Sequence, residues 1–170
     1  MKIYYGKAVY GKEEVQASIN VLKKKSLSLI DGPSVKKLEF LIAKTFGKKF
    51  GLMVNSGSSA NLLALASLKL KKGSEIITPT LTFSTTVAPI YQLGFVPHFI
   101  DVGPKNFVAK IEQIEKAINK KTKAIIIPNL LGNVPDWNKI YKISKKYGLK
   151  VIEDSADTIG YKLNGKKFGK

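Results

Sequence analysis

The stretch Lys123-Ala124-Ile125-Ile126-Ile127-Pro128 decides the fold class of this sequence. A continuous β-branched run that ends at a proline is typical of a strand buried on both faces of a parallel sheet. Comparable apolar runs lie on both sides of it along the chain. They predict further strands at 50–54, 75–79, 96–102 and 149–154.

Amphipathic segments with apolar residues at helical spacing precede or separate these runs. They predict a helix that ends at Leu93 and others at 12–26, 33–46, 58–70, 110–120 and 136–147. Alternating strands and helices predict an α/β fold, with a largely parallel, doubly wound sheet covered on both faces. Ligands of such sheets bind beyond the carboxyl ends of the strands, so the residues that follow each strand are candidates for a site.

One such segment is the turn Asn55-Ser56-Gly57-Ser58-Ser59, which leads directly into a helix. Gly57 permits a sharp turn and the close approach of a ligand. Ser58 and Ser59 are expected at the helix N-terminus, where free N–H groups and the positive end of the helix dipole favour a phosphate. An ordinary helix cap explains the same residue types, and for this stretch alone it is the commoner outcome.

Length and composition predict one globular domain, since 170 residues with 44% hydrophobic content can bury a sizeable core. The sequence contains no cysteine, which excludes disulfides, thiolate metal sites and cysteine nucleophiles, and we predict no metal. Residues 1–5 lack the apolar core of a signal peptide. No apolar run approaches the roughly 20 residues that span a bilayer. We therefore expect a cytoplasmic protein without a membrane partner.

The net charge of +17 raises the question of a nucleic-acid partner. All 29 basic residues are lysines, and arginine, which forks onto phosphates and guanine edges, is absent from the sequence. The lysines are spread along the chain in pairs such as Lys36-Lys37, Lys71-Lys72 and Lys145-Lys146. We expect a solvated basic surface that favours an anionic substrate. A basic nucleic-acid-binding module is the alternative.

Like the Gly57 turn, two further residues end or follow predicted strands. Asp154 ends the last predicted strand, and Phe83 follows another, where its ring can stack on a flat ligand. A ligand with a phosphate, a flat ring and a basic ring nitrogen would use all three features, and pyridoxal phosphate is such a ligand. Taken singly, Phe83 is more often core and Asp154 more often a helix cap. We interpret His98, the only histidine, as structural.

Four segments, in order and with matching spacings, resemble the DegT/StrS family: Asn55–Asn61, Ile77–Phe83, Lys121–Ile125 and Val151–Asp154. Its members are fold-type-I pyridoxal-phosphate enzymes. The resemblance extends from about Tyr5 to the last residue. It implies a sugar aminotransferase or related 3-dehydratase that acts on a nucleotide-linked 4-keto-6-deoxyhexose in cell-surface polysaccharide or deoxysugar synthesis. It also implies a homodimer.

The resemblance assigns roles to single residues. Ser58 and Ser59 match the phosphate-binding turn that follows the family's glycine, here Gly57. Phe83 matches the aromatic residue that stacks on the pyridine ring. Asp154 matches the catalytic acid that holds the pyridine nitrogen.

Asp157 matches a position near the cofactor's 3-hydroxyl that is commonly Gln or His in the aminotransferases. Residues 131–133 (Leu-Gly-Asn) and 153–157 (Glu-Asp-Ser-Ala-Asp) look like the 3-dehydratase branch of the family. In that branch a histidine replaces the Schiff-base lysine, and pyridoxamine phosphate is a non-covalent cofactor. The resemblance therefore leaves pyridoxal phosphate and pyridoxamine phosphate open.

The family's Schiff-base lysine follows the acid by a few tens of residues, and none of the 29 lysines here matches its motif. We expect that lysine, or the histidine that replaces it, beyond Lys170. Residues 1–170 are then the N-terminal portion of the large cofactor-binding domain. The remainder of that domain and the small C-terminal domain are expected to be absent.

Overall fold

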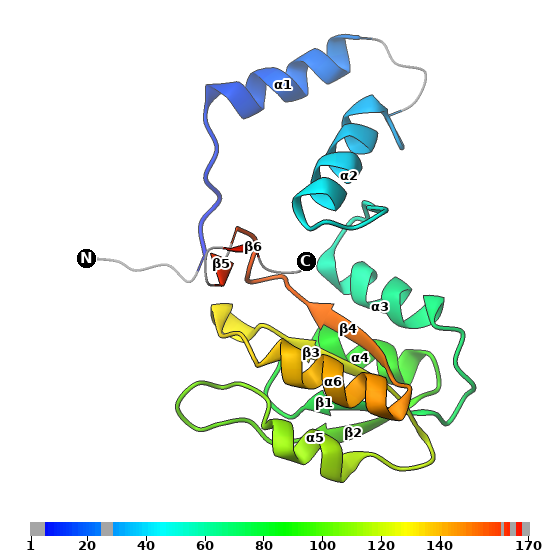
Figure 1. Ribbon diagram of the computed structural model, residues 1–170. Helices are drawn as coiled ribbons and strands as arrows, with labels where there is room; N and C mark the ends of the chain where they lie inside the picture. The colour runs from blue at the N-terminus through cyan, green and yellow to red at the C-terminus, as the bar shows by residue number, and fades with distance from the viewer. Residues whose placement is uncertain (1–5, 25–28, 161, 164–165, 168–170) are drawn as a thin grey trace.

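The centre of the molecule is a four-stranded, wholly parallel sheet of order β2-β1-β3-β4 (Figure 1). The computed structural model describes residues 6–24, 29–160, 162–163 and 166–167. The strands are β1 (Glu75–Pro79), β2 (Val96–Ile100), β3 (Thr122–Pro128) and β4 (Lys150–Asp154). The predicted α/β class and parallel sheet are confirmed.

Helices cover both faces of this sheet, as predicted for a doubly wound fold. One face carries α3 (Gly57–Ser67) and α4 (Ser84–Gln92), and the other carries α5 (Ile111–Ala117) and α6 (Trp137–Tyr147). The β3 strand has four fully buried residues in succession because neighbouring side chains point to opposite faces and both faces are covered.

The core consists of two apolar clusters, one on each face. Ile76 of β1 packs in the cluster that contains Leu65 of α3 and Ile90 of α4. The next residue, Ile77, packs in the cluster that contains Ile114 of α5 and Ile140 of α6. The side-chain period of two along β1 thus holds both helical layers against one sheet.

Local sequence explains why α6 forms where it does. The Asp136 carboxylate caps it by accepting a hydrogen bond from the Lys139 N–H at 3.1 Å. Trp137, Ile140 and Ser144 are its buried side chains and lie on one helical face. Gly148 ends the helix in the left-handed conformation, with φ at +66°.

The N-terminal arm, residues 6–53, packs differently. It contains α1 (Lys12–Lys23) and α2 (Pro33–Thr45), which stand apart from the sheet in Figure 1. In α1 no side chain is buried, and in α2 only Ala43 is. α2 lies close to its predicted range, and α1 begins where predicted, while residues 25–26 of that prediction lie outside the described residues. The apolar faces of both helices meet solvent in this chain.

The predicted buried strand at 50–54 is wrong. This segment is irregular, and Phe50, Leu52 and Met53 are exposed. It lies against α2, where the Met53 N–H donates to Glu39 Oε1 at 2.8 Å. A short apolar run cannot be assigned by periodicity alone, and here a side-chain acceptor replaces a strand partner.

The last described residues form two short antiparallel strands, β5 (Lys162–Leu163) and β6 (Lys166–Lys167). Residues 164–165 between them lie outside the described residues. Among the helices that the structure describes, none has the length and apolar character to cross a membrane.

Candidate functional site

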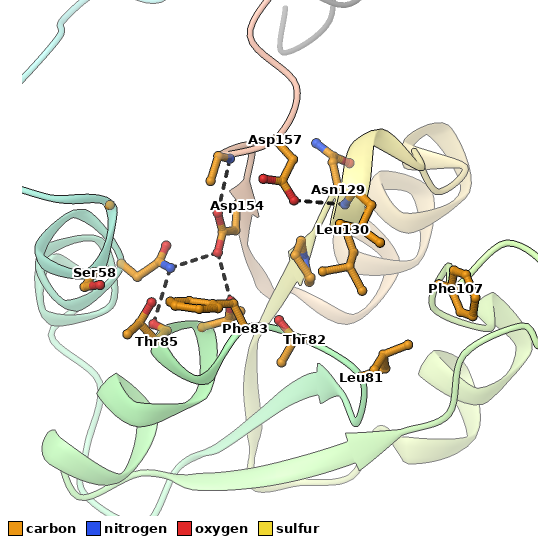
Figure 2. A pocket seen from close by; sticks show the side chains of 16 residues that line it. Ser58, Leu81, Thr82, Phe83, Thr85, Phe107, Asn129, Leu130, Asp154 and Asp157 are labelled. Atoms are coloured by element: carbon orange, nitrogen blue, oxygen red, sulfur yellow. Dashed lines mark hydrogen bonds between the residues drawn. The ribbon is translucent and has the colours of Figure 1, made fainter. Parts of the chain in front are cut away.

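A cavity of about 660 Å³ lies at the carboxyl ends of β3 and β4 and beside the N-termini of α3 and α4 (Figure 2). Five of the predicted site residues line it: Gly57, Ser58, Phe83, Asp154 and Asp157. Ser59 does not line it. The parallel topology has therefore brought together segments that are far apart in the sequence, at the edge where ligands of such sheets bind.

The N-terminus of α3 forms one end of the cavity. Its cap is Ser56, one residue earlier than predicted, whose Oγ accepts from the Ser59 N–H at 3.2 Å. This bond uses the Ser59 amide, and the Ala60 N–H donates to the Ser56 carbonyl. The N–H groups of Gly57 and Ser58 have no acceptor among the described residues and belong to the first helical turn.

The expected reason for Gly57 requires a correction. The residue does not adopt a left-handed φ, because the extended Ser56 makes the turn and Gly57 is already helical. A Cβ built on Gly57 would meet no atom within 4 Å. What the glycine provides is open space beside the N–H groups at the cavity.

Asp154, the last residue of β4, is the most firmly held acidic group in the cavity. Its Oδ2 accepts from the Asn61 amide at 2.8 Å and from the Thr86 hydroxyl at 2.9 Å, and its Oδ1 from the Ala156 N–H at 3.3 Å. Asn61 and Thr86 are both buried. The carboxylate is thus fixed in direction by two helices and remains a hydrogen-bond acceptor facing the cavity.

Sequence reasoning missed Asn61 and Thr86 as parts of the site. Asn61 is a polar residue on the otherwise apolar face of α3, and its amide also donates to the Thr85 carbonyl at 3.3 Å. A buried amide on an apolar face needs a polar partner, so Asn61 carried a detectable signal. Thr86 carried no such signal in the sequence, because a threonine in a helix can pack through its methyl group without a polar partner.

Phe83 is not a core residue. It precedes α4, its side chain is 67% exposed, and it lines the same cavity as Asp154. The core alternative raised by its sequence is therefore excluded. An exposed ring at a cavity wall can stack on a flat ligand.

Asp157 makes a different kind of contact. Its Oδ2 accepts from the Leu131 N–H at 2.9 Å, which ties the segment after β4 to the short helix η1 (Leu130–Gly132) after β3. Leu131 itself has a left-handed φ of +55°. One oxygen of Asp157 thus holds a turn at the cavity wall.

A buried polar network connects the residues at this edge of the sheet. The Asn129 side chain, 1% exposed, donates to Glu153 Oε1 and to Ser155 Oγ, each at 3.1 Å, and accepts from the Trp137 indole N–H at 2.9 Å. Its backbone N–H donates to the Asp154 carbonyl at 2.9 Å. Burial, and secondarily the charge of Glu153, raises the pKa of the nearby Tyr141 hydroxyl. The network fixes the ends of β3 and β4 relative to each other.

The remaining wall of the cavity is apolar and includes Leu81, Phe107 and Leu131. The Thr82 hydroxyl is buried without a partner among the described residues. His98 lies elsewhere. Its Nδ1 is 3.3 Å from Glu75 Oε2, a contact between neighbouring strands that agrees with a structural role.

The fold is that of the fold-type-I transferases. The model of the DegT/DnrJ/EryC1/StrS aminotransferase family matches residues 9–170. The chain belongs to this family.

Individual relatives differ in reaction. The GDP-4-keto-6-deoxy-D-mannose 3-dehydratase of Yersinia pseudotuberculosis is 41% identical over 81% of this chain and 37% of its own length. The UDP-N-acetyl-3-dehydro-alpha-D-glucosamine 3-aminotransferase of Acidithiobacillus ferrooxidans is 39% identical over 84% of this chain and 38% of its own. The chain spans about two fifths of the length of these relatives.

A solved structure agrees with the family match and with the similarity to these relatives. The Escherichia coli GDP-4-keto-6-deoxy-D-mannose-3-dehydratase with bound hydrated PLP superimposes with a TM-score of 0.86 at 37% identity. The match covers 94% of this chain and 42% of that structure.

The bond between Thr86 and Asp154 can be tested by stability. Thr86→Val keeps the shape but removes a donor to a carboxylate, and we expect the free energy of unfolding to fall by about 1.5 kcal/mol. This is the low end for a charged acceptor, because the carboxylate keeps some access to water. Denaturant unfolding measures the change. The control is Thr85→Val, whose hydroxyl bonds no described residue; an equal loss in both variants would contradict the assignment.

Proposed function

We propose that the protein carrying this chain is a pyridoxal- or pyridoxamine-phosphate-dependent enzyme that acts on a nucleotide-linked 4-keto-6-deoxyhexose. The observation that carries the proposal is the Asp154 carboxylate, fixed by Asn61 and Thr86 in a cavity that also exposes a helix N-terminus and an aromatic ring. The 3-dehydratase named among its relatives supports the 4-keto-6-deoxyhexose, and the named aminotransferase supports a nucleotide sugar. A cytoplasmic location is part of the proposal and rests on sequence alone.

The residues present fit such a cofactor. The open space beside Gly57 leaves room for a phosphate at the free N–H groups of the first turn of α3. In Figure 2, Ser58 stands to one side of Asp154 and Phe83 lies near the carboxylate. A phosphate site, an aromatic face and an acceptor for a ring N–H therefore share one cavity.

Each residue then has a definite task. Ser58 and the N–H groups of Gly57 and Ser58 bind the phosphate, and the Phe83 ring stacks on the pyridine. Asp154 accepts the ring N–H and keeps a proton on that nitrogen. The bound cofactor supplies an electron sink for the reacting carbon of the substrate. Asp157 has a second oxygen, without a bond to any described residue, that can face the ring's hydroxyl.

Amination and dehydration remain two forms of this proposal, since relatives of both kinds match the chain. The choice depends on the group that acts at the cofactor's carbon. Among the described residues, no lysine or histidine lines the cavity. The GDP-linked 4-keto-6-deoxymannose named for the dehydratases is the first substrate to test.

Asp154 is the decisive residue for activity. In the protein as its gene encodes it, we expect Asp154→Asn to retain part of its cofactor affinity and to lose activity by orders of magnitude, because an amide cannot keep the ring nitrogen protonated. Absorbance titration and turnover of the nucleotide sugar measure the two effects. Activity within a few-fold of wild type would remove Asp154 from the mechanism.

The phosphate site has its own test. A charge-assisted hydrogen bond contributes roughly 1.5–3 kcal/mol, so Ser58→Ala should weaken cofactor affinity by about ten- to a hundred-fold. Gly57→Val should weaken it more, because its side chain fills the open space beside the N–H groups. A cofactor titration followed by absorbance checks both. Unchanged affinity in both variants would mean that the turn is only a helix cap.

We also propose a homodimer. The N-terminal arm exposes large apolar side chains, among them Leu22, Phe40, Phe50 and Leu52, and such surfaces are usually covered by protein. Phe40→Lys should then shift the molecular mass in sedimentation from dimer toward monomer, whereas Lys37→Ala on the same helix should not. A wild-type protein that sediments as a monomer would contradict the dimer.

A further inference from the structure

Two bulky apolar residues at the cavity have unusual backbone conformations. Among the described residues other than glycine, four have a left-handed φ: Asp31, Lys69, Phe107 and Leu131. This conformation is costly for any residue with a Cβ, and especially for a bulky one. Phe107 and Leu131 both line the cavity, and they come from different loops. Strain of this kind persists where the surrounding structure fixes it, often at a binding site.

The loop that carries Phe107 is fixed by backbone hydrogen bonds. The Phe107 N–H donates to the Gly103 carbonyl at 2.9 Å, and the Gly103 N–H donates to the Val108 carbonyl at 2.8 Å. At the base of the loop, Lys110 Nζ lies 3.1 Å from Asp101 Oδ2. The loop therefore holds the Phe107 ring at the cavity with φ at +56°.

Leu131 is fixed by separate contacts. Its N–H donates to the Asp157 carboxylate, and the next N–H, of Gly132, donates to the Asn129 carbonyl at 3.2 Å. Its side chain is 61% exposed and that of Phe107 42%, so neither contributes a core contact that would justify the strain.

Phe107 lies away from the part of the cavity assigned to the cofactor, and Leu131 is tied through its N–H to Asp157 at the edge of that part. Figure 2 shows Phe107 and Leu81 on the side opposite Ser58, with Asp154 and Phe83 between them. A phosphate at Ser58 and a ring at Asp154 leave this apolar side free. The cavity volume of about 660 Å³ is within the range that holds a drug-sized ligand.

We propose that Phe107 and Leu131 form a specificity wall that receives the C6 methyl group of a 6-deoxyhexose. The proposal rests on the proposed function, which places a 6-deoxy sugar in this cavity. A methyl group gains contact with the wall. A hydroxymethyl group would place its oxygen against the apolar side chains of Phe107 and Leu131, where it would lose water without a hydrogen bond from either. The wall thus favours sugars that carry a methyl group at C6 over sugars that carry a hydroxymethyl group there.

Binding of two dead-end ligands tests this directly. GDP-mannose and GDP-6-deoxymannose differ only at C6, and their dissociation constants can be measured by calorimetry on the cofactor-loaded protein as its gene encodes it. We expect wild type to prefer the deoxy sugar by about 10- to 100-fold. Phe107→Ala and Leu131→Gly should each reduce this preference to within about three-fold and leave cofactor affinity unchanged. If the GDP pair does not bind, the dTDP-linked glucose and 6-deoxyglucose pair is compared in the same way.

Lys69→Gly is the matched control, because Lys69 has the same backbone strain at an exposed position outside the cavity. Glycine relieves the strain, so Lys69→Gly and Leu131→Gly should both raise the melting temperature by about 2–4 °C. Only Leu131→Gly should alter the choice between the two sugars. A lower melting temperature for Leu131→Gly would show that the side chain serves the fold.

The remaining outcomes separate this proposal from the proposed function. If the variants keep the wild-type preference, or if wild type has none, the wall does not distinguish the groups at C6. The proposal is then overturned, while the proposed function stands. A loss of cofactor affinity in Phe107→Ala as large as in Ser58→Ala would assign the wall to the cofactor and overturn it too. If wild type binds cofactor but neither sugar pair, or no cofactor at all, the proposed function fails, and this inference fails with it.

Discussion

The hydrogen bonds that converge on Asp154 are the interaction on which the site depends. A single carboxylate oxygen accepts from Asn61 of α3 and Thr86 of α4, while the residue itself ends β4. Three elements are therefore tied to one charged group. A charge that is partly removed from water must be paired or hydrogen-bonded, so the two donors stabilise the carboxylate. Because both donors are buried, they in turn need the carboxylate as their acceptor.

The cavity has two halves built in different ways. Near Asp154 and Ser58 it is polar, with donors and acceptors supplied by helix N-termini and strand ends. Near Phe107 and Leu131 it is apolar, and hydrogen bonds elsewhere in each loop maintain strained backbones. The polar half is suited to a charged, flat group and the apolar half to a small hydrophobic one. The Asn129 network beneath them keeps the ends of β3 and β4 in register.

Much of the fold could be predicted because periodicity is a local property. Residues 125–127 are all apolar, without helical spacing or a polar face. This is the pattern of a strand that is covered on both faces. The same reasoning failed at 50–54, where five residues are too few to separate a strand from an extended segment. There the Met53 N–H donates to Glu39, an acceptor on another element, and to no strand that the structure describes. Gly57 lines the cavity, but the sharp turn expected of it is wrong, since its backbone is ordinary; its missing side chain leaves room there.

The sequence by itself determined the class of fold and the position of Asp154 at a strand end, because strand termini and turn residues can be recognised within a few positions. It also indicated Phe83 and the Gly57 turn. Only the tertiary structure decided which donors hold the acid, since Asn61 and Thr86 lie 93 and 68 residues from it along the chain. The apolar wall was likewise invisible in the sequence. Phe107 and Leu131 come to line one cavity only after two loops are fixed by backbone hydrogen bonds and by the bond from the Leu131 N–H to the Asp157 carboxylate, and these bonds form only where segments of the folded chain meet.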